Sequence, residues 1–251
     1  MSFRSGTFGP ASIDRVDLSM LAEITGRSTK ACLERLASWS PDELAQEWRL
    51  MSPSQPAEIL EFYANTEGYV WELFAWHGSA AYNAHRRRID TLAPRWPSTT
   101  HARALDYGAG IGTAALELAA RGHRVTLAEV PGRTFEVAQA RFAGRGLAVD
   151  LISVTTDAPA LPAESWDVAI CFDVLEHVPD PAATARGLVR SVRPDGGLAI
   201  VTAFELQGAM YPQHLPEHAA RFGAGRWASL LKDFGAQELG DCVYRRTTFP
   251  A

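Results

Sequence analysis

The sequence contains few cysteines and no long apolar run. Its three cysteines, Cys32, Cys171 and Cys242, stand far apart and lack the spacing of a zinc site. An odd number of cysteines is typical of a reducing compartment and gives no disulfide framework. No uninterrupted apolar stretch approaches the length of a membrane span, and the N-terminus lacks the apolar core of a signal peptide. We therefore expect a cytoplasmic protein with no membrane partner.

The sequence also lacks an excess of basic residues. Lys and Arg number 24 against 29 Asp and Glu, which gives a formal net charge of −5. A nucleic-acid-binding surface usually needs a basic excess, although a local patch can survive such an average. We therefore expect a small-molecule substrate and no nucleic acid. The 251 residues are 47% hydrophobic and 21% charged, which is enough apolar material for one large globular domain or slightly more.

The pattern of apolar residues divides the chain into two parts. From about residue 17 to 93 the apolar residues recur at helical spacing, and Ser40-Pro-Asp-Glu43 is a capping box that predicts a helix ending near Met51. Further helices are expected from 56 towards 76 and from 79 to 92. The proline-rich stretch 94–98 then marks a boundary between residues 1–98, a mainly helical cap or dimerisation region, and residues 99–251.

The second part alternates strands and helices, which predicts an α/β fold with a mostly parallel sheet. Strands are expected near 103–107, 124–128, 148–152, 167–172 and 196–203, and helices near 112–121, 133–143 and 180–191. Residues 205–223 form a long insertion of the kind that often serves as a lid or substrate wall. A helix at 225–234 and a strand at 237–246 follow, so the sheet ends either at six strands or in a short hairpin that supplies a seventh.

A glycine-rich turn follows the first expected strand. Residues 105–112 read Leu-Asp-Tyr-Gly-Ala-Gly-Ile-Gly, and such glycines let the backbone approach a ligand and open a helix whose free N–H groups attract anions. Glu129 ends the next strand, where a carboxylate can accept hydrogen bonds from both hydroxyls of a ribose. The spacing Gly-x-Gly-x-Gly departs from the dinucleotide pattern Gly-x-Gly-x-x-Gly. It favours S-adenosylmethionine over NAD as the nucleoside ligand.

From about Ala102 to its end, the sequence resembles the class I S-adenosylmethionine-dependent methyltransferases. Five segments match in order: 106–112, Glu129, Asp157-Ala158, 166–178 and 194–201. The resemblance implies a Rossmann-like, doubly wound sheet and S-adenosyl-L-methionine as the cofactor, with S-adenosyl-L-homocysteine as its product. It also implies the cofactor-binding residues, which are Asp106, Gly108, Ala109, Gly110, Gly112, Glu129, Val130, Asp157, Ala158, Phe172 and Asp173. Taken singly, Asp106 is also a candidate helix cap, and Asp157 a candidate loop acid.

Three histidines are candidates for a catalytic base. His177 follows the fourth expected strand, where the resemblance also allows a supporting role beside the cofactor. His214 and His218 lie in the insertion, where the resemblance places residues that face the methyl group. Their spacing of four residues is found in helical metal sites, but Pro216 interrupts a helix there and no third ligand has a firm spacing. We therefore expect no bound metal.

Aromatic and basic residues of the helical part are candidates for contact with the acceptor. The substrate-binding residues predicted there are Trp76, His77, Tyr82 and His85, with Tyr211 added from the insertion. An aromatic run at helical spacing equally describes a packed core. Residues 85–88 read His-Arg-Arg-Arg, which predicts either a group that holds a carboxylate or phosphate or a solvated helix face near a helix C-terminus. The same region is a candidate surface for a homodimer.

The function predicted from these features is methyl transfer to a small molecule. The reaction needs no metal or covalent intermediate, and most of the catalysis should come from positioning. A histidine base fits O- or N-methylation, and C-methylation stays open. The alternatives are a non-catalytic module that binds the cofactor or a partner, an NAD-dependent oxidoreductase and an RNA methyltransferase. Frequent Ala and Arg indicate a bacterial protein of biosynthesis.

Overall fold

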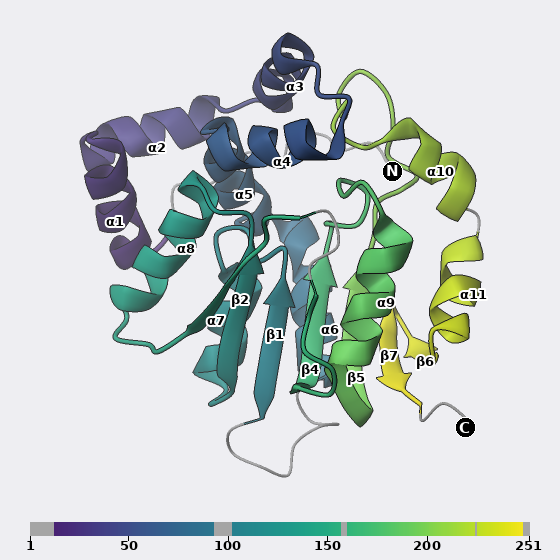
Figure 1. The fold of residues 1–251 in the computed structure, drawn as a ribbon. Coiled ribbons are helices and arrows are strands. Elements are labelled where there is room, and N and C mark those ends of the chain that lie inside the picture. The colour runs from purple at the N-terminus through teal and green to yellow at the C-terminus, as the bar shows by residue number, and fades with distance from the viewer. Residues whose placement is uncertain (1–12, 93–101, 157–159, 224, 248–251) are drawn as a thin grey trace.

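The computed structural model describes residues 13–92, 102–156, 160–223 and 225–247, so the predicted boundary at 94–98 lies outside the described residues. The chain begins with a series of short helices (Figure 1). These are α1 (Arg15–Thr25), α2 (Thr29–Ser38), α3 (Pro41–Met51), α4 (Pro56–Asn65), α5 (Gly68–His77), the 3₁₀ turn η2 (Ala80–Tyr82) and α6 (Asn83–Leu92). We call α1 to α5 the helical cap. The capping box at Ser40 and Glu43 is confirmed and starts α3.

The single helix expected from 56 towards 76 is wrong, because the chain breaks between α4 and α5. Thr66 takes an extended conformation after α4, and its hydroxyl donates a hydrogen bond to Glu47 Oε2 of α3 at 2.5 Å. A Cβ on Gly68 would lie 2.7 Å from the other carboxylate oxygen of Glu47. The Glu47 carboxylate of α3 thus contacts the chain on both sides of the break between α4 and α5.

The remaining part contains a seven-stranded sheet in the order β3-β2-β1-β4-β5-β7-β6. Its strands are β1 (Arg103–Tyr107), β2 (Arg124–Glu129), β3 (Asp150–Ser153), β4 (Trp166–Phe172), β5 (Val192–Val201), β6 (Ala236–Gly240) and β7 (Val243–Arg246). Strands β1 to β5 are parallel, and β7 pairs antiparallel with β5. The predicted α/β class with a mostly parallel sheet is confirmed. The one strand expected at 237–246 is a hairpin, because Asp241 and Cys242 both take positive φ and turn the chain.

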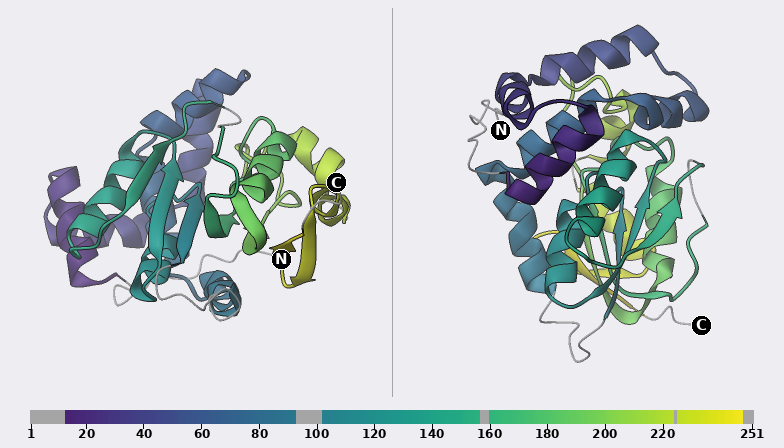
Figure 2. Two further views of the ribbon diagram at one scale, coloured as in Figure 1. Left: turned by 60° about the horizontal axis from the view of Figure 1, so that its bottom comes forward. Right: turned by 90° about the vertical axis from the view of Figure 1, so that its left-hand side faces the viewer.

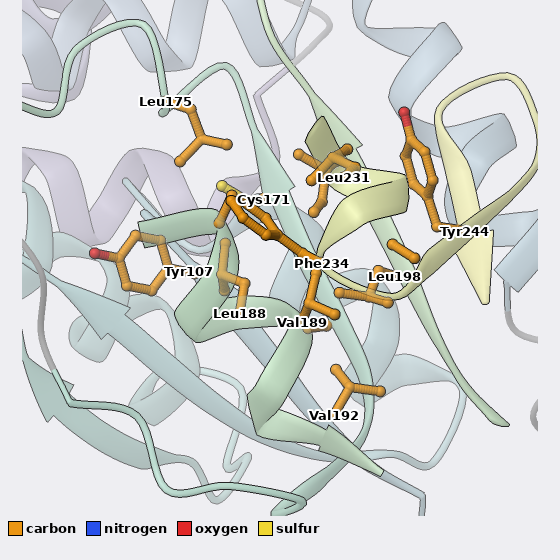
Figure 3. Packing of buried hydrophobic residues seen from close by; sticks show 14 of the residues in the cluster. Tyr107, Cys171, Leu175, Leu188, Val189, Val192, Leu198, Leu231, Phe234 and Tyr244 are labelled. Carbon is orange, nitrogen blue, oxygen red and sulfur yellow. The ribbon is translucent and has the colours of Figure 1, made fainter. Parts of the chain in front are cut away.

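Helices cover both faces of the sheet. The connecting helices are α7 (Thr113–Ala120), α8 (Arg133–Ala143), α9 (Pro181–Ser191), α10 (Pro216–Phe222) and α11 (Arg226–Asp233). Leu188 and Val189 of α9 pack with Leu198 of β5 and Leu231 of α11 on one face (Figure 3). On the other face, Ile89 and Leu92 of α6 pack with residues of α7 and α8. Helix α6 covers the sheet, although it precedes the predicted boundary. The division of the chain at residue 98 stays a prediction.

The helical cap lies over the carboxyl ends of the parallel strands and beside α8 (Figures 1 and 2). Trp71 and Phe74 of α5 pack with Ile111 and Val137 of the α/β part. A buried ion pair between Arg141 and Asp17, 2.8 Å long, joins α8 to α1. Strand order reverses between β1 and β4, and ligands of such sheets bind outside the carboxyl ends at this point. The cap therefore encloses the edge where a ligand is expected. No helix in the described ranges is both long and apolar enough to cross a membrane.

Candidate active site

The glycine turn after β1 brings backbone to the edge of the sheet. Gly108 and Gly110 have φ of 67° and 54°, the left-handed region that glycine enters without steric cost. A Cβ on Gly108 would overlap the side chain of Val174, and one on Gly110 would lie 2.7 Å from Leu73 Cδ1. Both positions therefore need glycine for backbone conformation and for space.

Glu129 is fixed beside this turn at the end of β2. Its two carboxylate oxygens accept hydrogen bonds from Gly110 N at 2.6 Å and Val130 N at 2.7 Å. Burial raises the pKa of Glu129, and these two backbone donors oppose the shift. The carboxylate is thus held at the tip of the second strand, where its remaining lone pairs can accept hydroxyl hydrogen bonds.

Asp106 reaches from the end of β1 to the start of α7. Its Oδ2 accepts a hydrogen bond from Ala115 N at 3.0 Å, so the carboxylate satisfies one of the free N–H groups of the helix. Burial raises its pKa to about 7, and the nearby charge of Glu129 adds to the shift. The Asp106 side chain therefore supports the helix while lining the same cavity as the glycines.

One cavity of about 1220 Å³ joins the glycine turn to the helical cap. It exceeds the roughly 300–1,000 Å³ of a typical pocket for one small ligand. It brings together most of the residues predicted from the sequence, namely Asp106, Gly108, Ala109, Gly110, Glu129, Val130, Phe172, Asp173, Trp76, His77, Tyr82, His85, Tyr211, His177 and His214. Asp157 and Ala158 lie outside the described residues. The cavity has room for a nucleoside cofactor and a second molecule.

Gly112 and His218 do not belong to the described lining. Gly112 caps α7, and a Cβ there would lie 3.3 Å from Ala138 Cβ, so this glycine allows α7 to approach α8. His218 is buried near Phe204 and Phe222, with its Nδ1 3.4 Å from the Glu176 carbonyl oxygen. Their places in the fold indicate packing rather than contact with a ligand.

His85 and Asp173 come together from α6 and the end of β4. The His85 Nε2 lies 2.7 Å from Asp173 Oδ2, and Arg88 donates to His85 Nδ1 at 3.2 Å. Since the guanidinium can only donate, the His85 proton is on Nε2 and points at Asp173. Both ring nitrogens are engaged, so His85 holds the Asp173 carboxylate rather than acting as a base.

His177 and His214 face the cavity from two different loops. The Leu206 carbonyl oxygen lies 2.6 Å from His214 Nδ1, so this nitrogen carries the proton and Nε2 keeps its lone pair. The His177 Nδ1 lies 2.9 Å from the Tyr63 hydroxyl and 3.3 Å from the Gln213 carbonyl oxygen. Burial lowers the pKa of both imidazoles. Both are therefore neutral near pH 7.

Glu176, which was not predicted from the sequence as a site residue, lies beside these two histidines. One ligand atom from each of Glu176, His177 and His214 lies within 4.8 Å of the others, an arrangement that can hold a metal ion. The Glu176 Oε1 accepts a hydrogen bond from Ala203 N, while Oε2 is buried without a partner among the described residues. A loop at 203–214 brings His214 to this position, and sequence spacing carries no signal for it.

Glu72, in the middle of α5, was likewise not predicted from the sequence as a site residue. Glu72 lines the cavity, and its enclosed Oε2 has no hydrogen-bond partner in the described part of the chain. Burial raises its pKa to about 8. The available signal was that Glu72 is the one acidic residue in the otherwise apolar and aromatic helix 68–77.

The basic cluster at 85–88 does not supply free cations to the cavity. Arg88 is the one Arg or Lys among the described lining residues, and it pairs with Asp241 at 2.8 Å. Arg86 pairs with Glu117 at 2.9 Å, and Arg87 is exposed. The geometry therefore favours the solvated-face interpretation of this cluster over a carboxylate- or phosphate-binding group.

Comparison with known proteins identifies the family of this chain. Residues 77–240 match the model of a protein family described as a methyltransferase domain. The chain is 34% identical over 118 residues to the ubiquinone biosynthesis O-methyltransferase of Stutzerimonas stutzeri, covering 43% of this chain and 51% of the relative. It is 31% identical over 157 residues to the protein of the same name in Xylella fastidiosa, covering 61% and 62%. The matched segments thus span about half to three fifths of these relatives.

The fold is also shared with solved structures. Phosphoethanolamine N-methyltransferase 2 of Haemonchus contortus, in complex with phosphomonomethylethanolamine and S-adenosylhomocysteine, superposes with a TM-score of 0.53. The match covers 74% of this chain and 46% of that chain at 17% sequence identity. At this identity the likeness shows the Rossmann-like fold alone.

Proposed function

The chain belongs to the class I S-adenosylmethionine-dependent methyltransferases, and on that premise we propose that it methylates an oxygen or nitrogen atom of a small molecule. The observation that carries the proposal is the single cavity that runs from the glycine turn to the helical cap. One end has the features of a nucleoside site, and the other end is enclosed by aromatic side chains and neutral histidines. Donor and acceptor can therefore be held together away from bulk water.

The residues at the sheet edge fit S-adenosylmethionine. Gly108 and Gly110 leave space that side chains would fill, and Glu129 offers a fixed carboxylate for the ribose hydroxyls. Asp106 and Asp173 add acidic groups to a site for a cationic ligand. When bound, the cofactor supplies a methyl group on a positively charged sulfur. The chain's own contribution at this end is to bind and orient.

The acceptor end offers a base with a defined tautomer. The Leu206 carbonyl oxygen keeps the proton of His214 on Nδ1, which leaves Nε2 to take a proton from an acceptor hydroxyl or amine. The depressed pKa keeps this imidazole neutral at pH 7. We assign His214 as the base in preference to His218, which is packed away from the cavity. The names of the curated relatives, both O-methyltransferases, support oxygen as the methylated atom.

Titration calorimetry with S-adenosylmethionine and S-adenosylhomocysteine tests the cofactor assignment. Both should bind, and Glu129→Ala should weaken binding by on the order of 2 kcal/mol through loss of charge-assisted hydrogen bonds. Glu136→Ala is the matched control, because Glu136 is exposed on the neighbouring helix α8. Absence of binding to the wild-type chain would overturn the proposed function. The homodimer and the cytoplasmic location stay predictions.

A further inference from the structure

Glu72 is a cavity-lining acid that the proposed methyl transfer does not use. It lies in the middle of α5, whose other residues toward the cavity include Tyr69, Leu73 and Trp76. Its Oε2 is enclosed, and the described part of the chain offers it no hydrogen-bond donor and no cationic partner. A buried charge is costly unless it is paired, so Glu72 keeps its proton near pH 7 when no cation is bound. A cation bound beside it would stabilise the carboxylate and let the proton leave.

Three tyrosines line the same cavity as Glu72 and lie within range of its charge. Burial is the main cause of the raised pKa of Tyr63, Tyr69 and Tyr211, and the negative charge of Glu72 adds to the shift in all three. Tyr63 and Tyr69 lie edge to face, with ring centroids 5.5 Å apart. Aromatic faces carry negative charge density and attract cations. The three rings, which come from α4, α5 and the loop 205–215, therefore add to the attraction of the carboxylate for a cation.

Acidic side chains outnumber basic ones in the rest of the described cavity wall, and burial raises the pKa of Asp106, Glu129 and Glu176, which reduces their negative charge until a cation binds. Its described acidic lining residues are Glu72, Asp106, Glu129, Asp173, Glu176 and Glu205, whereas its one basic side chain among the described residues, Arg88, is engaged by Asp241 and His85. The Nδ1 of His214 is engaged by the Leu206 carbonyl oxygen at 2.6 Å, and that of His177 lies 2.9 Å from the Tyr63 hydroxyl. An anionic acceptor would meet no available cation on this described wall.

From these contacts we propose that Glu72 is the specificity residue for the acceptor, and that the acceptor carries a basic amine. The ammonium group pairs with the Glu72 carboxylate among Tyr63, Tyr69 and Tyr211. This assignment rests on the proposed function, since it concerns the second ligand of the same cavity. The amine is the group that anchors the acceptor, and the base His214 acts at the methylated atom.

Three probes of equal ring size and different charge test the assignment. The full chain, saturated with S-adenosylhomocysteine, is titrated with 2-phenylethylamine, 2-phenylethanol and phenylacetate. The amine should bind about tenfold or more tightly than the alcohol, and phenylacetate should bind most weakly. An amine that binds no better than the alcohol, including binding of neither probe, overturns the proposal.

Two variants assign the selectivity to Glu72. Glu72→Gln keeps the shape of the side chain and should reduce amine affinity about tenfold or more while leaving alcohol affinity within about twofold. Glu61→Gln, at an exposed position on α4, should change neither affinity. Unchanged amine affinity in Glu72→Gln overturns the proposal. Binding of S-adenosylhomocysteine to the same variant is measured separately, so loss of the cofactor site is distinguished from loss of amine recognition.

Discussion

The two ends of the cavity are built in different ways. At the cofactor end, the functional groups come from short contiguous segments at the tips of β1, β2 and β4, and backbone amides fix Glu129. At the acceptor end, Tyr63, Glu72 and His214 come from α4, α5 and the loop before α10, and they meet only because the helical cap lies over the sheet. The first end is set by local backbone geometry, and the second by the docking of distant elements.

The largest effect should follow loss of the base at the acceptor end. His214→Ala should lower kcat about 100-fold or more, in line with the usual contribution of general base catalysis, and leave S-adenosylhomocysteine affinity within about twofold. The rate is measured with an acceptor identified by turnover of a metabolite panel. His123→Gln is the control, because His123 precedes β2 at the opposite edge of the sheet. Equal rates for wild type and His214→Ala would exclude His214 as the base.

The second prediction concerns the cost of burying Glu72. Burial raises its pKa from 4.5 to about 8, so the folded chain holds this proton more tightly than the unfolded chain does. The stability contributed by Glu72 therefore falls as pH rises from about 4.5 to about 8. Glu72→Gln should raise the free energy of unfolding by on the order of 3 kcal/mol at pH 8.5 relative to its effect at pH 4.5.

Urea unfolding at the two pH values measures this difference. Glu61→Gln serves again as the control and should show no such dependence. If Glu72→Gln changes the free energy of unfolding equally at both pH values, the carboxylate is solvated in the folded chain. The cofactor and acceptor ends of the cavity would then differ less than proposed.

The third prediction separates backbone strain from close contact at the cofactor end. Gly108→Ala should lower the free energy of unfolding by about 2 kcal/mol and weaken S-adenosylhomocysteine binding, because the methyl group would overlap Val174 at a positive φ. Gly146→Ala has nearly the same φ, 64° against 67°, and open space around the new methyl group. It should cost about 1 kcal/mol and leave binding unchanged. Equal effects of the two variants would mean that contact with Val174 is unimportant.

The smallest effect is expected where the cap contacts the site. Tyr63→Phe removes the hydroxyl that lies 2.9 Å from His177 Nδ1, and this should lower the free energy of unfolding by about 1 kcal/mol. Chemical denaturation measures the change. Glu129→Ala, tested above for the cofactor, is the complementary variant, since it should weaken cofactor binding and leave the contact between cap and site intact. A Tyr63→Phe chain as stable as wild type would show that this hydrogen bond does not hold the cap in place.

Several elements could be predicted from the sequence because their signals are local. The capping box of α3, the alternation of strands and helices, and the glycines after β1 each act within one segment, and the structure contains the corresponding elements. The break between α4 and α5 escaped prediction, and its contacts with Glu47 come from another helix that the local pattern does not reveal. The hairpin at 241–242 was one of two alternatives, and Gly240, which has a φ of 104° directly before the turn, was not used as a signal.

The order of strands and helices and the glycine turn after β1 could be predicted from the sequence, since hydrophobic period and glycine spacing act through the adjacent backbone. The position of Glu129 at the end of β2 followed from the same pattern. Only the packing of the whole chain shows that His85 contacts Asp173 and that His214, rather than His218, lines the cavity. It also shows that Glu72 Oε2 is enclosed with no hydrogen-bond partner among the described residues. These outcomes depend on how helices and loops far apart in the chain pack together. That packing sets where each of these side chains points and which groups pair with it.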